Sequence, residues 1–163
     1  MTTGRLDAEH ERFRAIVLEH QHEGESALVR GDVEPRLRLW SHHDPVTLFA
    51  AVGPTKAGWH DLEPTFRAVA TRLSGGRDVR YDLIAFDVSG DVAWSAGIAR
   101  FEVSMDGAPV APVVIRLTHA YRREDGVWKV VHEHSDFQPA DHALPVVDEV
   151  AGAVVGDDPQ IGR

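Results

Sequence analysis

The side chains with the greatest capacity for chemistry gather in one stretch, VVIRLTHAYRREDGVWKVVHEHSDFQ, which spans residues 113–138. Two runs rich in β-branched and aromatic residues flank Asp125-Gly126, a dipeptide that favours a hairpin turn because glycine adopts positive φ at little cost. We predict that this hairpin forms the floor of a small-molecule pocket. Its polar residues are Arg116, Thr118, His119, Tyr121, His132, Glu133, His134 and Asp136.

His119 and Tyr121 are the first candidates for acid–base catalysis. Imidazole titrates near neutral pH and suits proton transfer, and the phenol of Tyr121 is a hydrogen-bond donor. Asp44 or Asp136 would supply a partner carboxylate, which an apolar pocket would make more basic by burial. Structural roles stay open for the same residues. His119 can be a hydrogen-bonded wall residue, Asp44 can cap a turn, and Asp136 can pair with an arginine.

Aromatic and cationic side chains complete the candidate pocket. Trp40 and Trp59 flank loops at the expected pocket mouth, where they would contact a flat, largely apolar ligand. Arg116 can bind a ligand carboxylate bidentately or pair with a structural acid. The predicted ligand contacts are Trp40, Trp59, Phe66, Arg116, His132 and His134.

A metal site is a weaker alternative for the motif His132-Glu133-His134, with His119 as a third ligand if the hairpin places the three histidines on one face. Alternate residues of a strand lie about 6–7 Å apart, which is long for two ligands of one ion. The chain has no cysteine and therefore no thiolate ligand. We predict neither a metal nor a cofactor.

Composition excludes several classes of protein. The 163 residues include 26 acids and 17 Lys or Arg, which gives a net charge of −9 and no basic cluster for a phosphate backbone. The N-terminus lacks the pattern of a signal peptide, and no apolar run approaches about 20 residues. We therefore expect a cytoplasmic protein with no nucleic-acid or membrane partner.

Hydrophobic periodicity predicts an α+β fold. Helical patterns cover Leu6–Val29, Glu34–Leu39 and the segment after Gly58-Trp59, and a strand covers Val46–Val52. Turn dipeptides then separate four strands that must run antiparallel because their connections are short. These strands are Val79–Val88, Val92–Met105, Pro109–Glu124 and Val127–Phe137. We predict one domain over residues 1–139, followed by a loosely packed or disordered tail over residues 140–163.

Two sets of residues carry a family resemblance. Thr118, Tyr121, Asp125-Gly126, Trp128, Val131, His132 and His134 form the first set, and Trp40, Asp44-Pro45-Val46-Thr47-Leu48 and Gly58-Trp59 form the second. In both sets the chain resembles the SnoaL-like group of the nuclear-transport-factor-2-like superfamily. The resemblance implies a cone-shaped domain, with three helices on the concave face of a curved antiparallel sheet and a pocket between them. It also implies a homodimer formed across the outer sheet face.

The same resemblance implies two function classes. The superfamily includes ketosteroid isomerases, dehydratases and polyketide cyclases, and also an oligomeric kinase association domain. One hypothesis is a cofactor-independent cyclase, isomerase or dehydratase that acts on an aromatic or polyketide-like substrate. The alternative is a non-catalytic ligand-binding or oligomerisation module. The association domain looks to carry arginines where this chain has His119 and Ser135, so its preference for acidic ligands should not transfer.

The register of the hairpin decides which side chains share a face. A two-residue loop places His119 opposite His132 and leaves His132 and His134 on its face. A three-residue loop with a glycine bulge moves the pairing by one residue, and Glu133 then shares the face of His119. The hydrophobic pattern favours the first register and the family comparison favours the second, so both stay open.

Overall fold

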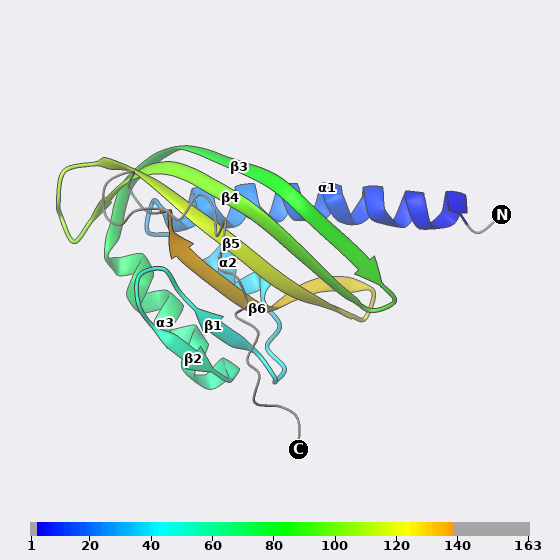
Figure 1. Cartoon of the computed structure of the whole chain (residues 1–163). Helices are drawn as coiled ribbons and strands as arrows, with labels where there is room; N and C mark the ends of the chain where they lie inside the picture. The colour runs from blue at the N-terminus through cyan, green and yellow to red at the C-terminus, as the bar shows by residue number, and fades with distance from the viewer. Residues whose placement is uncertain (1–2, 139–163) are drawn as a thin grey trace, which may run out of the picture.

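Three helices cover one face of a curved six-stranded sheet in the computed structural model, which describes residues 3–138 (Figure 1). The helices are α1 (Thr3–Leu28), α2 (Glu34–Leu39) and α3 (Trp59–Thr71). The strands are β1 (Thr47–Phe49), β2 (Thr55–Ala57), β3 (Leu73–Ser89), β4 (Val92–Met105), β5 (Ala111–Glu124) and β6 (Val127–Phe137). This arrangement confirms the predicted fold class. The predicted tail, residues 140–163, lies outside the described residues.

Helix α1 packs on the sheet through residues spaced four apart. Phe13 and Val17 are fully buried, and the ring of Phe13 meets those of Tyr121 and Trp128 edge-on. Gln21 and Glu25 continue the same spacing and are also buried, so one stripe of α1 changes from apolar to polar. No helix among the described residues is long and apolar enough to cross a membrane.

The sheet order is β2-β1-β6-β5-β4-β3. Strands β3 to β6 form the predicted antiparallel meander. The sequence did not reveal that β1 pairs in parallel with β6, nor that Gly53 lies in a turn between β1 and a further strand, β2. Strand β3 begins at Leu73, well before the predicted start at Val79, because Leu73 pairs with Met105 at the end of β4.

A β-bulge at Val131 settles the hairpin register. Glu124 pairs with Val127 across a two-residue turn, and Tyr121 pairs with Val130. The next pairs are Ala120 with His132 and His119 with Glu133, so Val131 is the extra residue. The turn therefore has the two-residue loop of the first predicted register. Beyond the bulge, Glu133 shares the face of His119, as in the second predicted register. Since one residue of shift reverses the face, Glu133 and Ser135 turn toward the helices.

Gly97 provides a test of how closely β3 and β4 pack. A Cβ atom at this position would overlap the phenol of Tyr81 and lie 2.7 Å from the carbonyl oxygen of Asp82. We expect Gly97→Ala to lower the free energy of unfolding by about 1–3 kcal/mol, because overpacking displaces neighbours. Urea denaturation followed by circular dichroism measures this change. A loss below about 0.5 kcal/mol, the usual range of surface substitutions, would contradict the packing.

Candidate functional site

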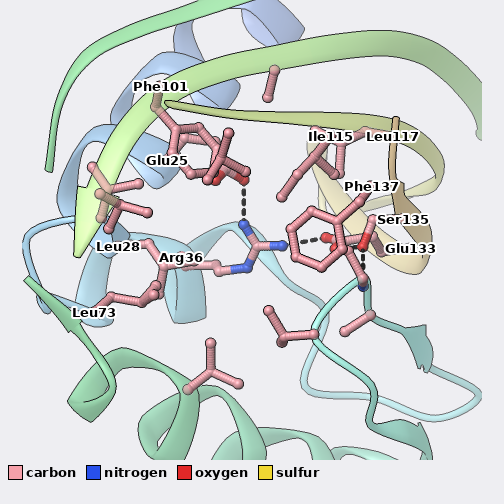
Figure 2. A pocket seen from close by; sticks show the side chains of 18 of the residues that line it. Glu25, Leu28, Arg36, Leu73, Phe101, Ile115, Leu117, Glu133, Ser135 and Phe137 are labelled. Atoms are coloured by element: carbon pink, nitrogen blue, oxygen red, sulfur yellow. Dashed lines mark hydrogen bonds and ion pairs between the residues drawn. The ribbon is translucent and has the colours of Figure 1, made fainter. Parts of the chain in front are cut away.

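A cavity lies between the helices and the concave face of the sheet (Figure 2). Its open volume is about 70 Å³, and one water needs roughly 10–15 Å³, so it admits about five waters or a small ring. Phe137 lines the cavity and is also exposed, which marks the open end. The apolar walls include Leu28, Leu48, Phe66, Leu73, Ala99, Phe101, Val103, Val113, Ile115 and Leu117.

Three charged side chains form the polar part of the cavity lining. The guanidinium of Arg36 lies between Glu25 and Glu133 (Figure 2). Its Nη1 donates to Glu25 Oε1 at 2.6 Å, and its Nη2 donates to Glu133 Oε2. All three side chains are buried. Arg36 also packs over the ring of Phe66, with its Cζ 5.3 Å from the ring centroid.

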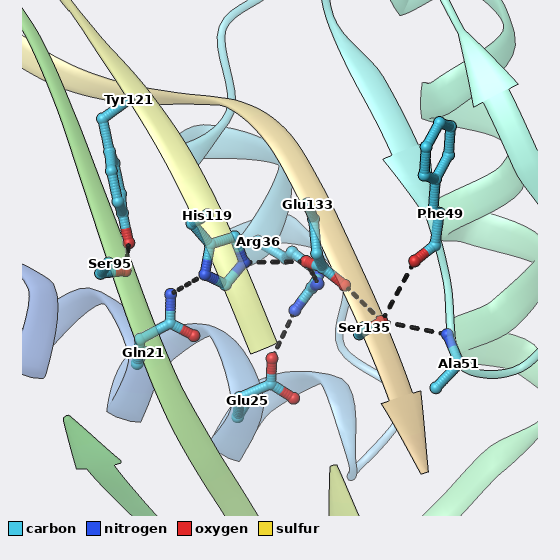
Figure 3. Close-up of polar contacts among 10 residues, drawn as sticks. All are labelled: Gln21, Glu25, Arg36, Phe49, Ala51, Ser95, His119, Tyr121, Glu133 and Ser135. Carbon is cyan, nitrogen blue, oxygen red and sulfur yellow. Dashed lines mark hydrogen bonds and ion pairs between the residues drawn. The ribbon is translucent and has the colours of Figure 1, made fainter. Parts of the chain in front are cut away.

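His119 extends this polar cluster away from the cavity (Figure 3). Its Nε2 lies 3.0 Å from Glu133 Oε2, and its Nδ1 lies 3.2 Å from the amide nitrogen of Gln21. An amide nitrogen can only donate, so Nδ1 accepts and Nε2–H donates to Glu133 in the neutral imidazole. Both ring nitrogens are therefore occupied by the protein. Tyr121 lies beside His119, and its hydroxyl bonds that of Ser95 at 2.9 Å.

Ser135 ties the polar cluster to the segment after β1. Its hydroxyl donates to Glu133 Oε1 at 3.1 Å and accepts the backbone N–H of Ala51 at 3.0 Å (Figure 3). Glu133 thus has hydrogen-bond partners on both oxygens, from α2, β5 and its own strand. Such complete satisfaction is what a buried carboxylate requires.

Electrostatic shifts agree with this geometry. Burial would raise the pKa of Glu133, but Arg36 and the hydrogen bond from His119 outweigh it and lower that pKa to about 2. Burial would lower the pKa of Arg36, but Glu133 and Glu25 outweigh it and raise that pKa. Burial raises the pKa of the Tyr121 phenol. The salt bridge and the phenol therefore keep their protonation states across the physiological range.

Glu25 differs from Glu133 in its hydrogen bonding. Oε1 of Glu25 is held by Arg36, whereas Oε2 has no hydrogen-bond partner among the described residues. Glu25 lines the cavity, and Oε2 is not enclosed by protein atoms. It is therefore the carboxylate oxygen left to face a bound molecule.

Comparison with known proteins gives the family. The family model of the SnoaL-like domain matches residues 25–139. The chain belongs to the SnoaL-like domain family. A search of curated protein sequences found no match.

Solved structures share the fold of this SnoaL-like domain at low sequence identity. A nuclear transport factor 2-like superfamily protein from Salmonella enterica serovar Typhimurium is 14% identical, with 82% of this chain and 96% of that chain covered and a TM-score of 0.65. A proposed dehydratase of the NTF2-like family from Streptomyces avermitilis is 17% identical, with 82% and 99% covered and a TM-score of 0.61. A proposed calcium/calmodulin-dependent protein kinase II association domain from Xanthomonas campestris is 20% identical, with 77% and 87% covered and a TM-score of 0.58.

Of the four predicted catalytic residues of this SnoaL-like domain, His119 and Tyr121 lie side by side, and the two aspartates lie elsewhere. His119 and Tyr121 are buried on the concave face but do not line the cavity. Asp44 accepts the backbone N–H of Trp59 at 2.9 Å, which is the capping role at the start of α3. Asp136 forms an exposed ion pair with Arg116 on the outer face. Neither aspartate meets His119, whose carboxylate partner is a glutamate.

Of the six predicted ligand contacts, Phe66 lines the cavity. Trp40 is buried against Phe66, with ring centroids 5.0 Å apart. Trp59 stacks on His42, with ring centroids 4.0 Å apart. Neither tryptophan lines the cavity. The remaining three, Arg116, His132 and His134, lie on the outer side of the sheet.

The bulge separates the histidines of the alternative metal site. His132 bonds the hydroxyl of Thr47 at 2.7 Å, and both His132 and His134 meet the ring of Phe49. His119 faces the helices instead. Within residues 3–138, no group of three or more His, Asp or Glu side chains converges in a way that could hold a metal ion.

Sequence reasoning missed Glu25 and Arg36 as site residues. For Glu25 a signal was present, because Phe13, Val17, Gln21 and Glu25 recur every four residues and so share one face of α1. A polar residue that continues an apolar stripe marks a buried polar position. The six-residue helix around Arg36 is too short to show such a pattern.

The low pKa of Glu133 predicts acid sensitivity. A carboxyl whose folded pKa lies below its ordinary 4.5 contributes stability above about pH 4.5 and loses that contribution as pH falls toward 2. We expect the wild-type free energy of unfolding to fall between pH 6 and pH 3 by about 2 kcal/mol more than that of Glu133→Gln. Urea denaturation at the two pH values measures the difference.

Glu63→Gln is the matched control for this measurement. Glu63 forms an exposed pair with Arg67 one turn away, and its replacement should leave the wild-type pH dependence unchanged. Equal pH dependence in the wild type and Glu133→Gln would contradict the electrostatic account of Glu133.

Proposed function

We propose that this SnoaL-like domain binds a small, largely apolar molecule in the cavity and transfers a proton to or from it through Glu25. The observation that carries the proposal is the free Oε2 of Glu25 at the polar end of an apolar cavity. A general base needs an oxygen within hydrogen-bond reach of the ligand. The cavity walls supply binding through the hydrophobic effect.

Glu25 is better suited to proton transfer than its neighbours. Glu133 has a low pKa, which makes it a weak base, and both its oxygens are occupied. His119 has protein partners on both nitrogens and does not line the cavity. Their role in the proposal is to hold Arg36, which in turn orients Glu25.

The reaction class we propose is acid–base chemistry that needs no cofactor, such as cyclisation, isomerisation or dehydration of an aromatic or polyketide-like compound. Each of these reactions moves a proton on an apolar carbon skeleton. The name of the Streptomyces avermitilis neighbour, a proposed dehydratase, supports this class. The sequence led us to expect a histidine paired with an aspartate as the acid–base group, whereas the proposal assigns proton transfer to Glu25.

Retention of a small molecule gives the first test of binding. Native mass spectrometry of the purified chain should detect a bound small molecule, which tandem mass spectrometry then identifies. We expect Val113→Phe, which fills the cavity rim, to lose the bound mass, and the neighbouring Val114→Phe to retain it because alternate residues of a strand face opposite sides. Equal retention by both variants would show that the molecule binds elsewhere.

Proton transfer is tested with the molecule so identified. Turnover by Glu25→Gln at saturating substrate should fall by about 10²-fold or more, because the amide of Gln cannot take up the proton. Glu23→Gln is the control, since Glu23 lies on the same helix and forms only an exposed pair with Arg38. Unchanged turnover in Glu25→Gln would reduce the proposal to binding without catalysis.

We also propose a homodimer formed across the outer sheet face. Large apolar side chains exposed there include Ile84 at 67%, Trp94 at 44% and Phe49 at 41%. Exposed apolar surface of this kind is typical of interaction sites. The assembly would leave the cavity accessible, because the cavity lies on the opposite side of the sheet.

Light scattering tests the dimer. At micromolar concentration we expect a mass of twice the 18.0 kDa of the chain, and a shift to the monomer mass for Trp94→Arg because a charge is costly at a buried apolar contact. Val110→Arg, at an exposed apolar residue in the loop between β4 and β5, should stay dimeric. A monomeric wild type would rule the dimer out.

A further inference from the structure

We infer, building on the proposed binding function, that the ligand is an apolar compound that ends in a hydrogen-bond donor, either a hydroxyl or an ammonium group, and that Glu25 selects this head group. Four features of the cavity support the inference: the hydrogen-bonding capacity of Glu25, the engagement of Arg36 by two carboxylates, the charge of the cluster, and the dimensions of the walls.

Glu25 offers an acceptor to the cavity. An ionised carboxylate has no proton to donate and can only accept hydrogen bonds. Arg36 Nη1 occupies Oε1 at 2.6 Å, and Oε2 has no partner among the described residues. Protein atoms do not enclose Oε2, so a bound molecule can reach it. A ligand O–H or N–H placed at Oε2 completes the hydrogen bonding of Glu25.

Arg36, the charged donor beside Glu25, is engaged by the two carboxylates. Nη1 and Nη2 each donate one N–H to a carboxylate and each carry a second N–H. The Nε has no hydrogen-bond partner, but protein atoms enclose it completely. A ligand acceptor would meet a guanidinium whose charge is already paired, whereas a hydroxyl or ammonium meets the unpartnered Oε2 of Glu25.

The charge of the cluster disfavours an anionic head group. Glu25 and Glu133 carry two negative charges against the one positive charge of Arg36, and these are the charged side chains that line the cavity. His119 lies behind Glu133. The net charge of the cluster is −1 when His119 is a neutral imidazole and zero when it is an imidazolium. A ligand carboxylate would meet Glu25 with no free cation, in surroundings that screen charge poorly. An ammonium would instead neutralise the cluster.

The walls set the body of the ligand. Aliphatic and aromatic side chains surround the open volume of about 70 Å³, which suits one six-membered ring with a short substituent at its closed end. A longer chain attached to the ring would pass Phe137 at the open end. A benzyl group carries the needed ring and places its head group one carbon away.

Four probes with this one body separate the head groups. Toluene has no polar head, benzyl alcohol and benzylammonium have a donor, and benzoate has only acceptors. Titration of the full chain, followed by the methyl ¹H–¹³C shifts of Val103, Ile115 and Leu117, gives the affinity at the cavity itself. We expect both donor probes to bind at least about tenfold more tightly than toluene, a factor that one retained hydrogen bond supplies. Benzoate should leave the cavity methyl groups unshifted.

Glu25→Gln should remove the preference of the cavity for an ammonium head group. With the Gln carbonyl held by Arg36, its amide NH₂ faces the cavity, so benzylammonium should lose at least about tenfold in affinity while toluene stays within twofold of the wild type. Glu23→Gln should change neither probe. Equal wild-type affinities for toluene and the donor probes, binding of benzoate, or equal effects of the two variants would each overturn the inference and leave the cavity as a binding site. No shift with any probe would overturn the inference and the proposed binding together.

Discussion

The guanidinium of Arg36 is the interaction on which the interior of this domain depends. It brings α1, α2 and β6 together through Glu25 and Glu133, two buried carboxylates that would otherwise repel each other. Removal of one partner of a buried ion pair typically costs about 3–5 kcal/mol, because a charge is left without compensation. Apolar side chains of similar volume would often stabilise the interior at least as well as three buried charges. Charged groups kept in a cavity despite this cost are consistent with a functional site.

The bulge at Val131 determines which residues join that cluster. Without the extra residue, His132 would face the helices in place of Glu133, and the cavity would end in imidazoles. With it, Glu133 and Ser135 point inward and His132 and His134 point outward. Hydrophobic alternation predicted the four strands of the meander, apart from the early start of β3, and the dipeptide Asp125-Gly126 predicted the last turn. It left the register open, because a bulge is a one-residue event that leaves little trace in a periodic pattern.

The remaining differences between expectation and structure have similar causes. The family resemblance correctly predicted the cone-shaped α+β fold and three helices on the concave face. The parallel pairing of β1 with β6 depends on contacts between distant segments, which local patterns do not report. The predicted pair of His119 with an aspartate became His119 with Glu133, because strand register rather than residue type decides neighbours. Arg36 lies on a helix of six residues, where periodicity carries almost no information.

Two ion pairs between α1 and α2 permit the most direct test of the central claim. Arg36 with Glu25 is buried, and Arg38 with Glu23 joins the same two helices at the surface. Double-mutant cycles on unfolding free energy, with Met for Arg and Gln for Glu, measure the coupling of each pair. The account predicts a coupling on the order of 3 kcal/mol for the buried pair and below about 1 kcal/mol for the exposed pair. Equal couplings would show that Arg36 does not organise the site.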